Sequence, residues 1–308
     1  MSEGVVTRST GSWYYVRQNG DEPVPCRIKG KFRLKEIRAT NPVAVGDLVT
    51  FSLEEGQNSG LITAIHPRKN YIIRKASNLS REYQLIACNI DIAWLMVSMV
   101  APKTLTAFID RFLVSAEAFR IPVIILFNKT DIYDETERKE MDQLIRVYTG
   151  AGYPCYPVSV LKREGIDRIR DEMKGKVSVI SGNSGVGKSA LIQAVDPALI
   201  LKTGEISEYH LAGKHTTTYA EMFELASGGA VIDTPGIRGF GTIDIAREEL
   251  FHFFPEIFRE SGNCQYHNCL HLMEPKCAVK KAVDEGTISE SRYLSYLAML
   301  EDSSEKYR

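Results

Sequence analysis

The sequence predicts an α/β protein in which a doubly wound domain lies between a small N-terminal β-barrel and a helical C-terminal region. Three observations predict this arrangement. Short strand patterns separated by turns fill residues 1–67, buried strands alternate with helical patterns in residues 68–240, and an acidic helical stretch with clustered cysteines fills residues 241–308. Alternating strands and helices favour a parallel sheet covered by helices. We therefore expect three domains with these boundaries.

The composition is that of an ordinary soluble protein, with 44% hydrophobic and 25% charged residues. The longest apolar run, Ile90 to Val100, contains Asp91 and is too short to span a bilayer. Met1 to Gly4 does not form a basic start followed by an apolar run, so we expect no signal peptide, no membrane contact and a cytoplasmic location. The net charge of −1 gives no general attraction to nucleic acid, so any RNA contact requires a local patch.

The N-terminal region has the strand spacing of a small barrel. We expect strands at Val5–Thr7, Trp13–Val16, Val24–Arg33, Asp47–Leu53 and Gly60–His66. Their length and spacing fit an OB-fold. Basic residues concentrate between Arg27 and Arg38, around Phe32. This segment suits an RNA-facing strand with a stacking aromatic, although a solvated strand and loop explains the charge equally well.

The central region alternates between buried strands and amphipathic helices. Strands are expected at Ile90–Val97, Val123–Phe127, Tyr156–Val158 and Val177–Ile180, and helices at Thr106–Phe119 and Glu135–Tyr148. In a doubly wound sheet the loops at the carboxyl ends of the strands carry the ligand. The chemically informative motifs of this sequence follow these strands directly.

A phosphate-binding P-loop of the form GxxxxGKS follows the Val177–Ile180 strand. Its residues are Gly182, Asn183, Ser184, Gly185, Val186, Gly187, Lys188 and Ser189, and Ala190 comes next in the following helix. The glycines allow backbone N–H groups to surround the β-phosphate at the helix N-terminus. We expect Lys188 to bridge the β- and γ-phosphates and to act in catalysis, and Ser189 to ligate Mg²⁺.

A second phosphate-site motif, DxxG, comes about fifty residues later and runs from Asp233 to Gly236. We expect Asp233 to hold Mg²⁺ through water and the Gly236 N–H to contact the γ-phosphate. Between the two motifs lie three adjacent threonines, 216–218, which also suit the start of a strand. We favour Thr217 or Thr218 as the residue that closes on the γ-phosphate, with Thr217 as the Mg²⁺ ligand.

A guanine-reading NKxD motif follows the Val123–Phe127 strand. It consists of Asn128, Lys129, Thr130 and Asp131. The Asp131 carboxylate accepts two hydrogen bonds from guanine, whereas adenine lacks both donors and would leave the carboxylate unpaired. Lys129 is expected to lie along the base. Ser159, after the Tyr156–Val158 strand, is placed for a backbone contact to guanine, or is an ordinary strand-end serine.

The order of these motifs is unusual, because NKxD precedes the P-loop by about fifty residues. In an ordinary GTPase the P-loop comes first. Both motifs must meet one nucleotide, so the sequence predicts a circularly permuted P-loop GTPase domain. An ATP-dependent small-molecule kinase also uses a P-loop, but Asp131 argues against it.

Hydrolysis requires a group that orients water, and the usual glutamine position after DxxG holds Ile237. Either intrinsic hydrolysis is slow or another residue serves. His215, beside the threonines, is the nearest catalytic candidate, and a surface histidine next to Lys214 is the equal alternative.

The C-terminal region carries the pattern Cys264-x4-Cys269-x-His271-x5-Cys277. Three thiolates and one imidazole form a closed tetrahedral set suited to one structural zinc ion. His267 is the alternative nitrogen ligand. The three other cysteines are scattered, which favours a metal site in a reducing compartment over a disulfide framework.

Together, the motif order, the barrel and the cysteine cluster closely resemble the RsgA (YjeQ) family over essentially the whole chain. The resemblance implies an OB-fold, a permuted GTPase domain and a helical zinc domain. It also implies GTP hydrolysis stimulated by the small (30S) ribosomal subunit during its late maturation, with rRNA, GTP and GDP as partners and a monomeric protein. The alternative is an rRNA-binding module whose nucleotide regulates affinity and whose turnover is incidental, which Ile237 keeps open.

Overall fold

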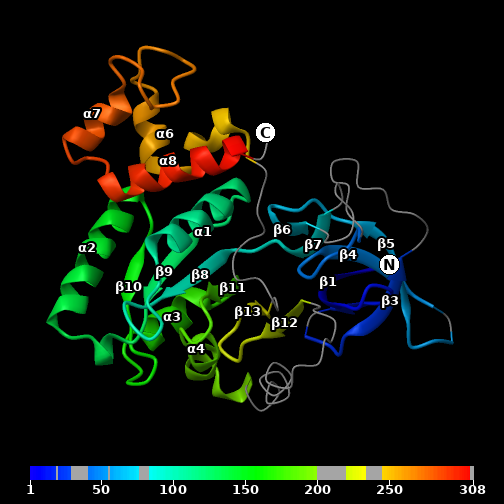
Figure 1. Ribbon diagram of the computed structural model, residues 1–308. Helices are drawn as coiled ribbons and strands as arrows, with labels where there is room; N and C mark the ends of the chain where they lie inside the picture. Colours follow the sequence, from blue (N-terminus) through cyan, green and yellow to red (C-terminus); the bar gives the residue numbers. More distant parts are fainter. Residues whose placement is uncertain are drawn as a thin grey trace. The chain divides into compact units, whose positions relative to one another are not determined.

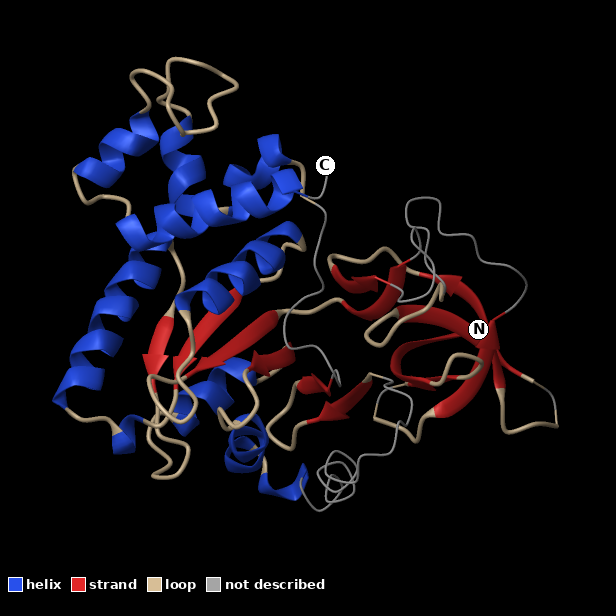
Figure 2. Ribbon diagram, viewed as in Figure 1, coloured by secondary structure: helices blue, strands red, loops and turns tan. Residues whose placement is uncertain are grey.

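The computed structural model describes residues 1–18, 20–28, 41–54, 56–75, 83–199, 220–233 and 245–305. The chain divides into two units. Figures 1 and 2 show the helices and strands of these residues. The first unit comprises Met1–Trp94, Gly165–Ser181 and Lys188–Gly241, and the second comprises Leu95–Glu164, Gly182–Gly187 and Thr242–Arg308. Among the helices in the described ranges, none combines the length and apolarity needed to cross a membrane.

The first unit begins with a closed five-stranded barrel. Its strands are β1 (Ser2–Ser9), β2 (Tyr14–Arg17), β3 (Val24–Ile28), β4 (Leu48–Leu53) and β5 (Gly60–Ile65). They pair in the order β1-β2-β3-β5-β4 and close through β4 and β1, with β3 and β5 parallel and the other pairs antiparallel. Val6, Val16, Val49 and Ile62 fill its core. The predicted OB-type barrel is therefore confirmed, and the end of the strand expected at Val24–Arg33 lies outside the described residues.

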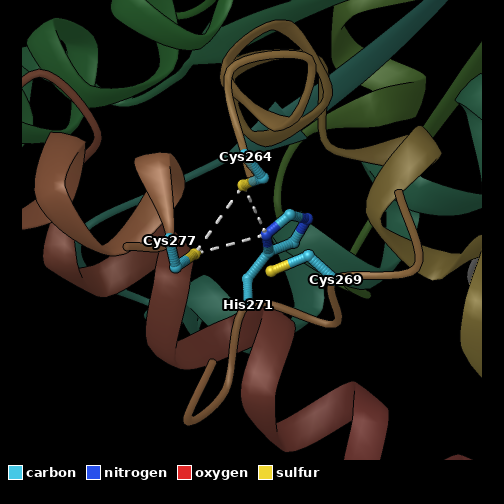
Figure 3. A group of neighbouring side chains, drawn as sticks. All are labelled: Cys264, Cys269, His271 and Cys277. Carbon is cyan, nitrogen blue, oxygen red and sulfur yellow. Dashed lines mark hydrogen bonds between the residues drawn. The ribbon is translucent and has the colours of Figure 1, made fainter. Parts of the chain in front are cut away.

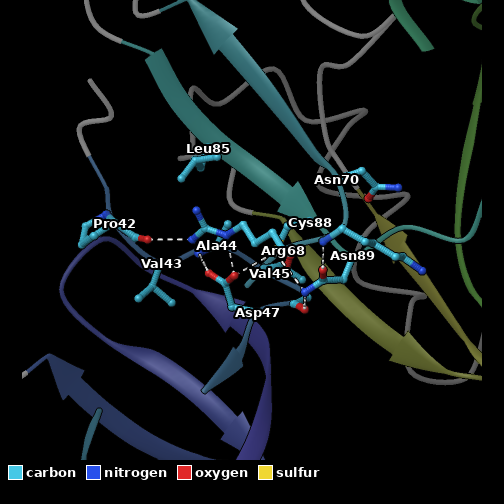
Figure 4. Close-up of polar contacts among 12 residues, drawn as sticks. Pro42, Val43, Ala44, Val45, Asp47, Arg68, Asn70, Leu85, Cys88 and Asn89 are labelled. Carbon is cyan, nitrogen blue, oxygen red and sulfur yellow. Dashed lines mark hydrogen bonds and ion pairs between the residues drawn. The ribbon is translucent and has the colours of Figure 1, made fainter. Parts of the chain in front are cut away.

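An antiparallel hairpin, β6 (Tyr71–Lys75) and β7 (Tyr83–Cys88), follows the barrel and was not predicted. Arg68 fastens the start of this hairpin to the barrel through the fully buried Asp47, with Nε–Oδ1 and Nη2–Oδ2 distances of 2.6 and 2.7 Å. The Cys88 thiol donates to the same carboxylate at 3.1 Å (Figure 4). Barrel and hairpin thus share one buried, hydrogen-bonded charge pair.

The rest of the first unit contains strands β11 (Val177–Gly182, all but its last residue), β12 (Glu221–Glu224) and β13 (Ala230–Asp233) and helices α3 (Ile166–Met173) and α4 (Lys188–Val195). β11 and β13 are parallel, whereas β12 is antiparallel to β13. β12 also pairs with β1 at Arg8↔Glu221. The barrel strands therefore continue the same sheet as β11, β13 and β12.

The second unit contains the end of β8 (Ile92–Val97), then α1 (Thr106–Ala118), β9 (Val123–Phe127), the 3₁₀ turn η1 (Thr130–Ile132), α2 (Glu135–Ala151) and β10 (Cys155–Pro157). β9 is buried along its whole length and pairs in parallel with β10. The Asn128 N–H donates to the carbonyl of Val97 at 2.9 Å, which places NKxD beside the carboxyl end of β8.

The C-terminal part of the second unit is helical. It comprises the 3₁₀ helix η2 (Arg247–Phe253), α6 (Pro255–Ser261), α7 (Ala278–Asp284) and α8 (Glu290–Glu305). Phe254, Ile257, Val279 and Tyr296 are fully buried in its core, and the buried Cys269 belongs to the same cluster. The cysteine cluster is therefore built into the core of this region.

Candidate functional site: a nucleotide loop and a cysteine–histidine cluster

The P-loop occupies the turn between β11 and α4, as its sequence predicts. Gly182 has φ of +144°, and a Cβ there would lie 2.4 Å from the carbonyl oxygen of Met96. Gly187 has φ of +111°, and a Cβ there would lie 2.5 Å from Nδ2 of Asn128. Only glycine accommodates both the backbone conformation and the close contact. The loop is therefore pressed against β8 and against the NKxD motif.

Asn128 is the residue that joins the predicted phosphate loop to the predicted base-binding loop. Its side chain is 2% exposed. Nδ2 donates to the carbonyl of Val186 at 2.8 Å, and Oδ1 accepts from the N–H of Val160 at 3.1 Å. Two motifs that lie far apart in the sequence are therefore held together by one buried amide whose donor and acceptor are both satisfied.

Lys129 makes a second bridge to the P-loop. Its backbone is left-handed, with φ of 73°. Its ammonium donates to the carbonyl of Gly185 at 2.9 Å and to the carbonyl of Ala101. These contacts hold the long side chain across the loop.

Asp131 and Ser159 form a hydrogen-bonded pair. The hydroxyl of Ser159 is buried and donates to Oδ1 of Asp131 at 2.6 Å. It also accepts from the N–H of Lys162 at 3.1 Å, while the Ser159 N–H donates to the carbonyl of Glu164 at 3.2 Å. Ser159 thus fixes the direction of the carboxylate through its side chain. Its N–H is engaged by Glu164, so the predicted backbone contact with guanine stays a prediction.

Tyr133 is a site residue that the sequence reasoning missed. Its buried hydroxyl donates to the carbonyl of Asn128, accepts from the N–H of Met99 at 3.0 Å and lies 3.2 Å from the hydroxyl of Ser98. Burial raises the pKa of the phenol, so it remains a donor at neutral pH. The only signal in the sequence is an aromatic residue two positions after Asp131.

The remaining nucleotide residues divide into two groups. Lys188, Ser189 and Ala190 open α4, and Asp233 ends β13, all in the first unit. His215, Thr217, Thr218, Gly236 and Ile237 lie outside the described residues, so their predicted roles stay predictions.

The four predicted metal ligands converge on one point. One ligand atom from each of Cys264, Cys269, His271 and Cys277 lies within 4.8 Å of all the others. His271 Nδ1 is 3.6 Å from Cys264 Sγ and 3.5 Å from Cys277 Sγ (Figure 3). His267, the alternative ligand, is exposed and does not belong to the cluster.

The cluster fits a zinc ion by chemistry as well as by position. Burial lowers the pKa of His271 and keeps the imidazole neutral, which is the form that binds metal. Burial raises the pKa of the Cys269 thiol to about 12, so the zinc must displace a proton there when it binds. Such a Cys₃His set is closed and structural rather than catalytic.

Glu274 holds the loop that presents His271. Its two carboxylate oxygens accept from the N–H groups of Leu270 and Leu272 at 2.8 and 2.7 Å. Tyr293 also donates to the carbonyl of His271 at 2.6 Å. The loop is therefore fixed by hydrogen bonds at His271 and at the residues before and after it.

Comparison with known sequences decides the family. A model of the RsgA GTPase domain matches residues 65–243, and a model of the RsgA N-terminal domain matches residues 3–62. The chain belongs to the RsgA GTPase family. A Bacteroides fragilis protein named small ribosomal subunit biogenesis GTPase RsgA is 57% identical over 307 residues and 99% of both chains. A Christiangramia forsetii protein of the same name is 51% identical over 99% of this chain and 98% of its own.

Solved structures of the family agree with the fold. YjeQ from Thermotoga maritima is 33% identical with a TM-score of 0.80 and covers 98% of both chains. YloQ, described as a circularly permuted GTPase, is 34% identical with a TM-score of 0.77 and covers 99% of this chain and 96% of its own. The predicted fold class is therefore confirmed: a permuted GTPase fold with an N-terminal barrel and a cysteine–histidine cluster that fits zinc.

Proposed function

We propose that this chain is a GTP hydrolase that acts as a late maturation factor of the small ribosomal subunit. The observation that carries the proposal is the tie between Asn128 and Val186, which places a guanine motif against a P-loop that follows it in the sequence. The relatives named small ribosomal subunit biogenesis GTPases supply the subunit as the partner.

Each nucleotide residue has a distinct task in this proposal. The P-loop backbone and Lys188 bind the phosphates, Asp131 selects guanine, and Ser159 orients Asp131. Ser189 and Asp233, with Thr217 or Thr218 and the Gly236 N–H, would hold Mg²⁺ and the γ-phosphate. Mg²⁺ supplies charge neutralisation at the phosphates when it is bound.

Each of the three expected domains has its own role in this proposal. We infer that the barrel, residues 1–67, contacts rRNA, that residues 68–240 bind and hydrolyse GTP, and that residues 241–308 carry one structural zinc on Cys264, Cys269, His271 and Cys277. The same proposal places the protein in the cytoplasm as a monomer. The nucleotide acts as a switch: GTP orders the threonine loop, and the ordered loop favours the subunit-bound state.

The decisive experiment is single-turnover GTP hydrolysis with and without purified small ribosomal subunits, with large subunits as the matched control. We expect strong stimulation by small subunits alone. ATP should neither compete for binding nor be hydrolysed. Equal turnover with and without subunits, together with nucleotide-dependent binding to them, would favour the rRNA-binding module with incidental turnover. Hydrolysis of ATP would instead indicate a kinase-type site.

A further inference from the structure

Three charged residues lie side by side across three neighbouring strands of the first unit. Arg8 on β1 is the register partner of Glu221 on β12, and Glu221 is the register partner of Asp233 on β13. Directly opposed residues in antiparallel strands point to the same face with Cβ atoms about 5 Å apart. Glu221 therefore lies between a cation of the barrel and the aspartate of the DxxG motif.

Glu221 is partly shielded from solvent and has a charged residue on each side, so its charge acts on both neighbours. The residue is half-buried, and burial raises the pKa of its carboxyl, Arg8 lowers it, and Asp233 raises it again. Two neighbouring carboxylates repel each other, and the repulsion is relieved by a cation on either side. Arg8 is the cation on the barrel side. Mg²⁺ at Asp233 would be the cation on the nucleotide side.

Arg8 can be reached by a ligand. It is exposed, its guanidinium lies 5.5 Å from the ring centroid of Tyr15, and both residues line a groove of about 710 Å³. The same groove contains Arg17, which pairs with Glu224 at 2.9 Å. The groove is also lined by Asp196, Glu221 and Glu224, and Arg17 is paired with Glu224. Arg8, beside the ring of Tyr15, is therefore the arginine of this groove that is placed to bind an RNA phosphate.

We propose that Glu221 is a positioning residue that couples this groove to the nucleotide site: an RNA phosphate bound at Arg8 withdraws the cation from Glu221 and thereby raises the affinity of Asp233 for Mg²⁺. The inference rests on the proposed function, because it takes Asp233 as a Mg²⁺-binding residue. The coupling is reciprocal, so Mg²⁺–GTP strengthens the binding of RNA phosphate at Arg8 by the same factor.

The sign of the coupling separates this role from a structural one. Removing the negative charge in Glu221→Gln weakens Mg²⁺ binding, whereas removing the positive charge in Arg8→Gln strengthens it. Because Arg8 acts through Glu221, the double variant behaves as Glu221→Gln does. Arg8→Lys keeps the positive charge and therefore the wild-type affinity for Mg²⁺. Loss of structure would move both single variants in the same direction.

Glu224 supplies the matched control. It lies on the same strand, lines the same groove and pairs with Arg17, but its partner on β13 is Ala230 rather than an acid. Glu224→Gln therefore makes the same change of charge at a position with no route to Asp233 through a register pair.

The experiment is a Mg²⁺ titration of the binding of a fluorescent, non-hydrolysable GTP analogue to the full chain. We expect the half-saturating Mg²⁺ concentration to rise about threefold in Glu221→Gln and to fall about threefold in Arg8→Gln, as for a partly exposed charge pair. Glu224→Gln should match the wild type. Purified small subunits should lower the half-saturating Mg²⁺ concentration of the wild type and leave that of Glu221→Gln unchanged.

Two results would overturn the coupling: equal shifts in Glu221→Gln and Glu224→Gln, or shifts of the same sign in Glu221→Gln and Arg8→Gln. The exposed Arg8 variant keeps the test decisive even where Glu221→Gln folds poorly. A wild-type chain that does not bind the analogue at any Mg²⁺ concentration would overturn the proposed function and this inference together. Normal analogue binding with no charge-dependent shift would overturn this inference alone.

Discussion

Arg292 on α8 and Asp110 on α1 form an ion pair in the interior of the second unit, with 2.8 Å between Nη1 and Oδ1 and both side chains 1% exposed. Arg292 also donates through Nε to Glu256 on α6 at 2.7 Å, and its guanidinium lies 4.6 Å from the ring centroid of Phe254. One buried cation therefore serves two buried carboxylates. The helices of the C-terminal region are fixed to the helix that follows β8 by this network.

We predict that Arg292→Met destabilises the protein by about 3–5 kcal/mol, because it leaves two carboxylates buried without a cation. The chain offers a matched control in Arg111 and Asp302, which join the same two helices but are both 61% exposed. Arg111→Met should cost less than about 1 kcal/mol, since solvent screens an exposed pair. Urea denaturation of both variants measures the difference. Equal losses would contradict the buried-network account.

Local sequence patterns predicted the parts of the fold that are determined by residues close together in the sequence. The strand Val123–Phe127 has the predicted ends because its side chains are continuously apolar and Asn128 follows at once. The P-loop glycines and the cysteine spacing specify a backbone shape and a side-chain cluster within a few residues, so the sequence predicted the loop conformation and the cysteine–histidine cluster that the structure shows. Strand and helix ends elsewhere differ by a few residues, as expected where fraying and capping set the boundary.

Contacts between distant segments were not predictable in the same way. Arg292 and Asp110 are 182 positions apart, and nothing in either local pattern indicates their pairing. The β6–β7 hairpin was not predicted, and its attachment to the barrel through Asp47 and Arg68 joins residues that no local pattern connects. Tyr133 reads as an ordinary core aromatic, and only its hydrogen bonds in the structure connect it to NKxD.

We predict that the chain binds about one zinc ion, as a complete four-ligand set does. Cys277→Ser should lose the metal and destabilise the C-terminal helices, because Cys277 also accepts from the N–H of Lys280 at the start of α7. The affinity for a GTP analogue should be largely retained. Metal analysis and thermal denaturation measure both effects, with Cys155→Ser as the control that keeps its zinc. Zinc retained after joint replacement of Cys269 and Cys277 would refute the ligand set.

A pH effect is expected from Cys155 at the start of β10. Burial raises the pKa of its thiol to about 11, whereas an unfolded cysteine ionises near about 8.5. The stability contributed by this thiol is complete below about pH 8.5 and is lost as the pH rises towards about 11.

The wild type should therefore lose roughly 2 kcal/mol relative to Cys155→Ser between about pH 7.5 and about pH 10.5. Denaturation of both proteins at the two pH values isolates the contribution of the Cys155 thiol, because the contributions of all other titrating groups cancel in the difference. A difference in stability that stays constant with pH would show that the thiol is not protected in the native state.

Guanine selection should follow Asp131. In Asp131→Asn the hydroxyl of Ser159 keeps an oxygen to donate to, so the loop is retained while one acceptor becomes a donor. We expect GTP affinity to fall by at least about tenfold, and xanthosine triphosphate, whose 2-oxo group accepts, to bind better than GTP. Ser159→Ala is the control: it removes the hydrogen bond that orients the Asp131 carboxylate and should weaken GTP binding, with no change of base preference. Competition binding with both nucleotides gives the ratio, and wild-type GTP affinity in Asp131→Asn would remove the NKxD assignment.

Hydrolysis should depend on His215 only when the small subunit is present. Ile237 cannot orient water, so the isolated protein should turn over slowly, and rRNA binding should order the loop that carries His215 and bring the imidazole towards the γ-phosphate. His215→Ala should then lose most of the stimulated rate, on the order of 10²-fold, and keep its GTP affinity, because the group acts in the transition state. Lys188→Ala should lose nucleotide binding itself. Single-turnover rates and analogue affinities, measured for both variants with and without subunits, separate the two roles. Equal stimulated rates in wild type and His215→Ala would exclude the histidine from the mechanism and leave the water to a group supplied by the ribosome.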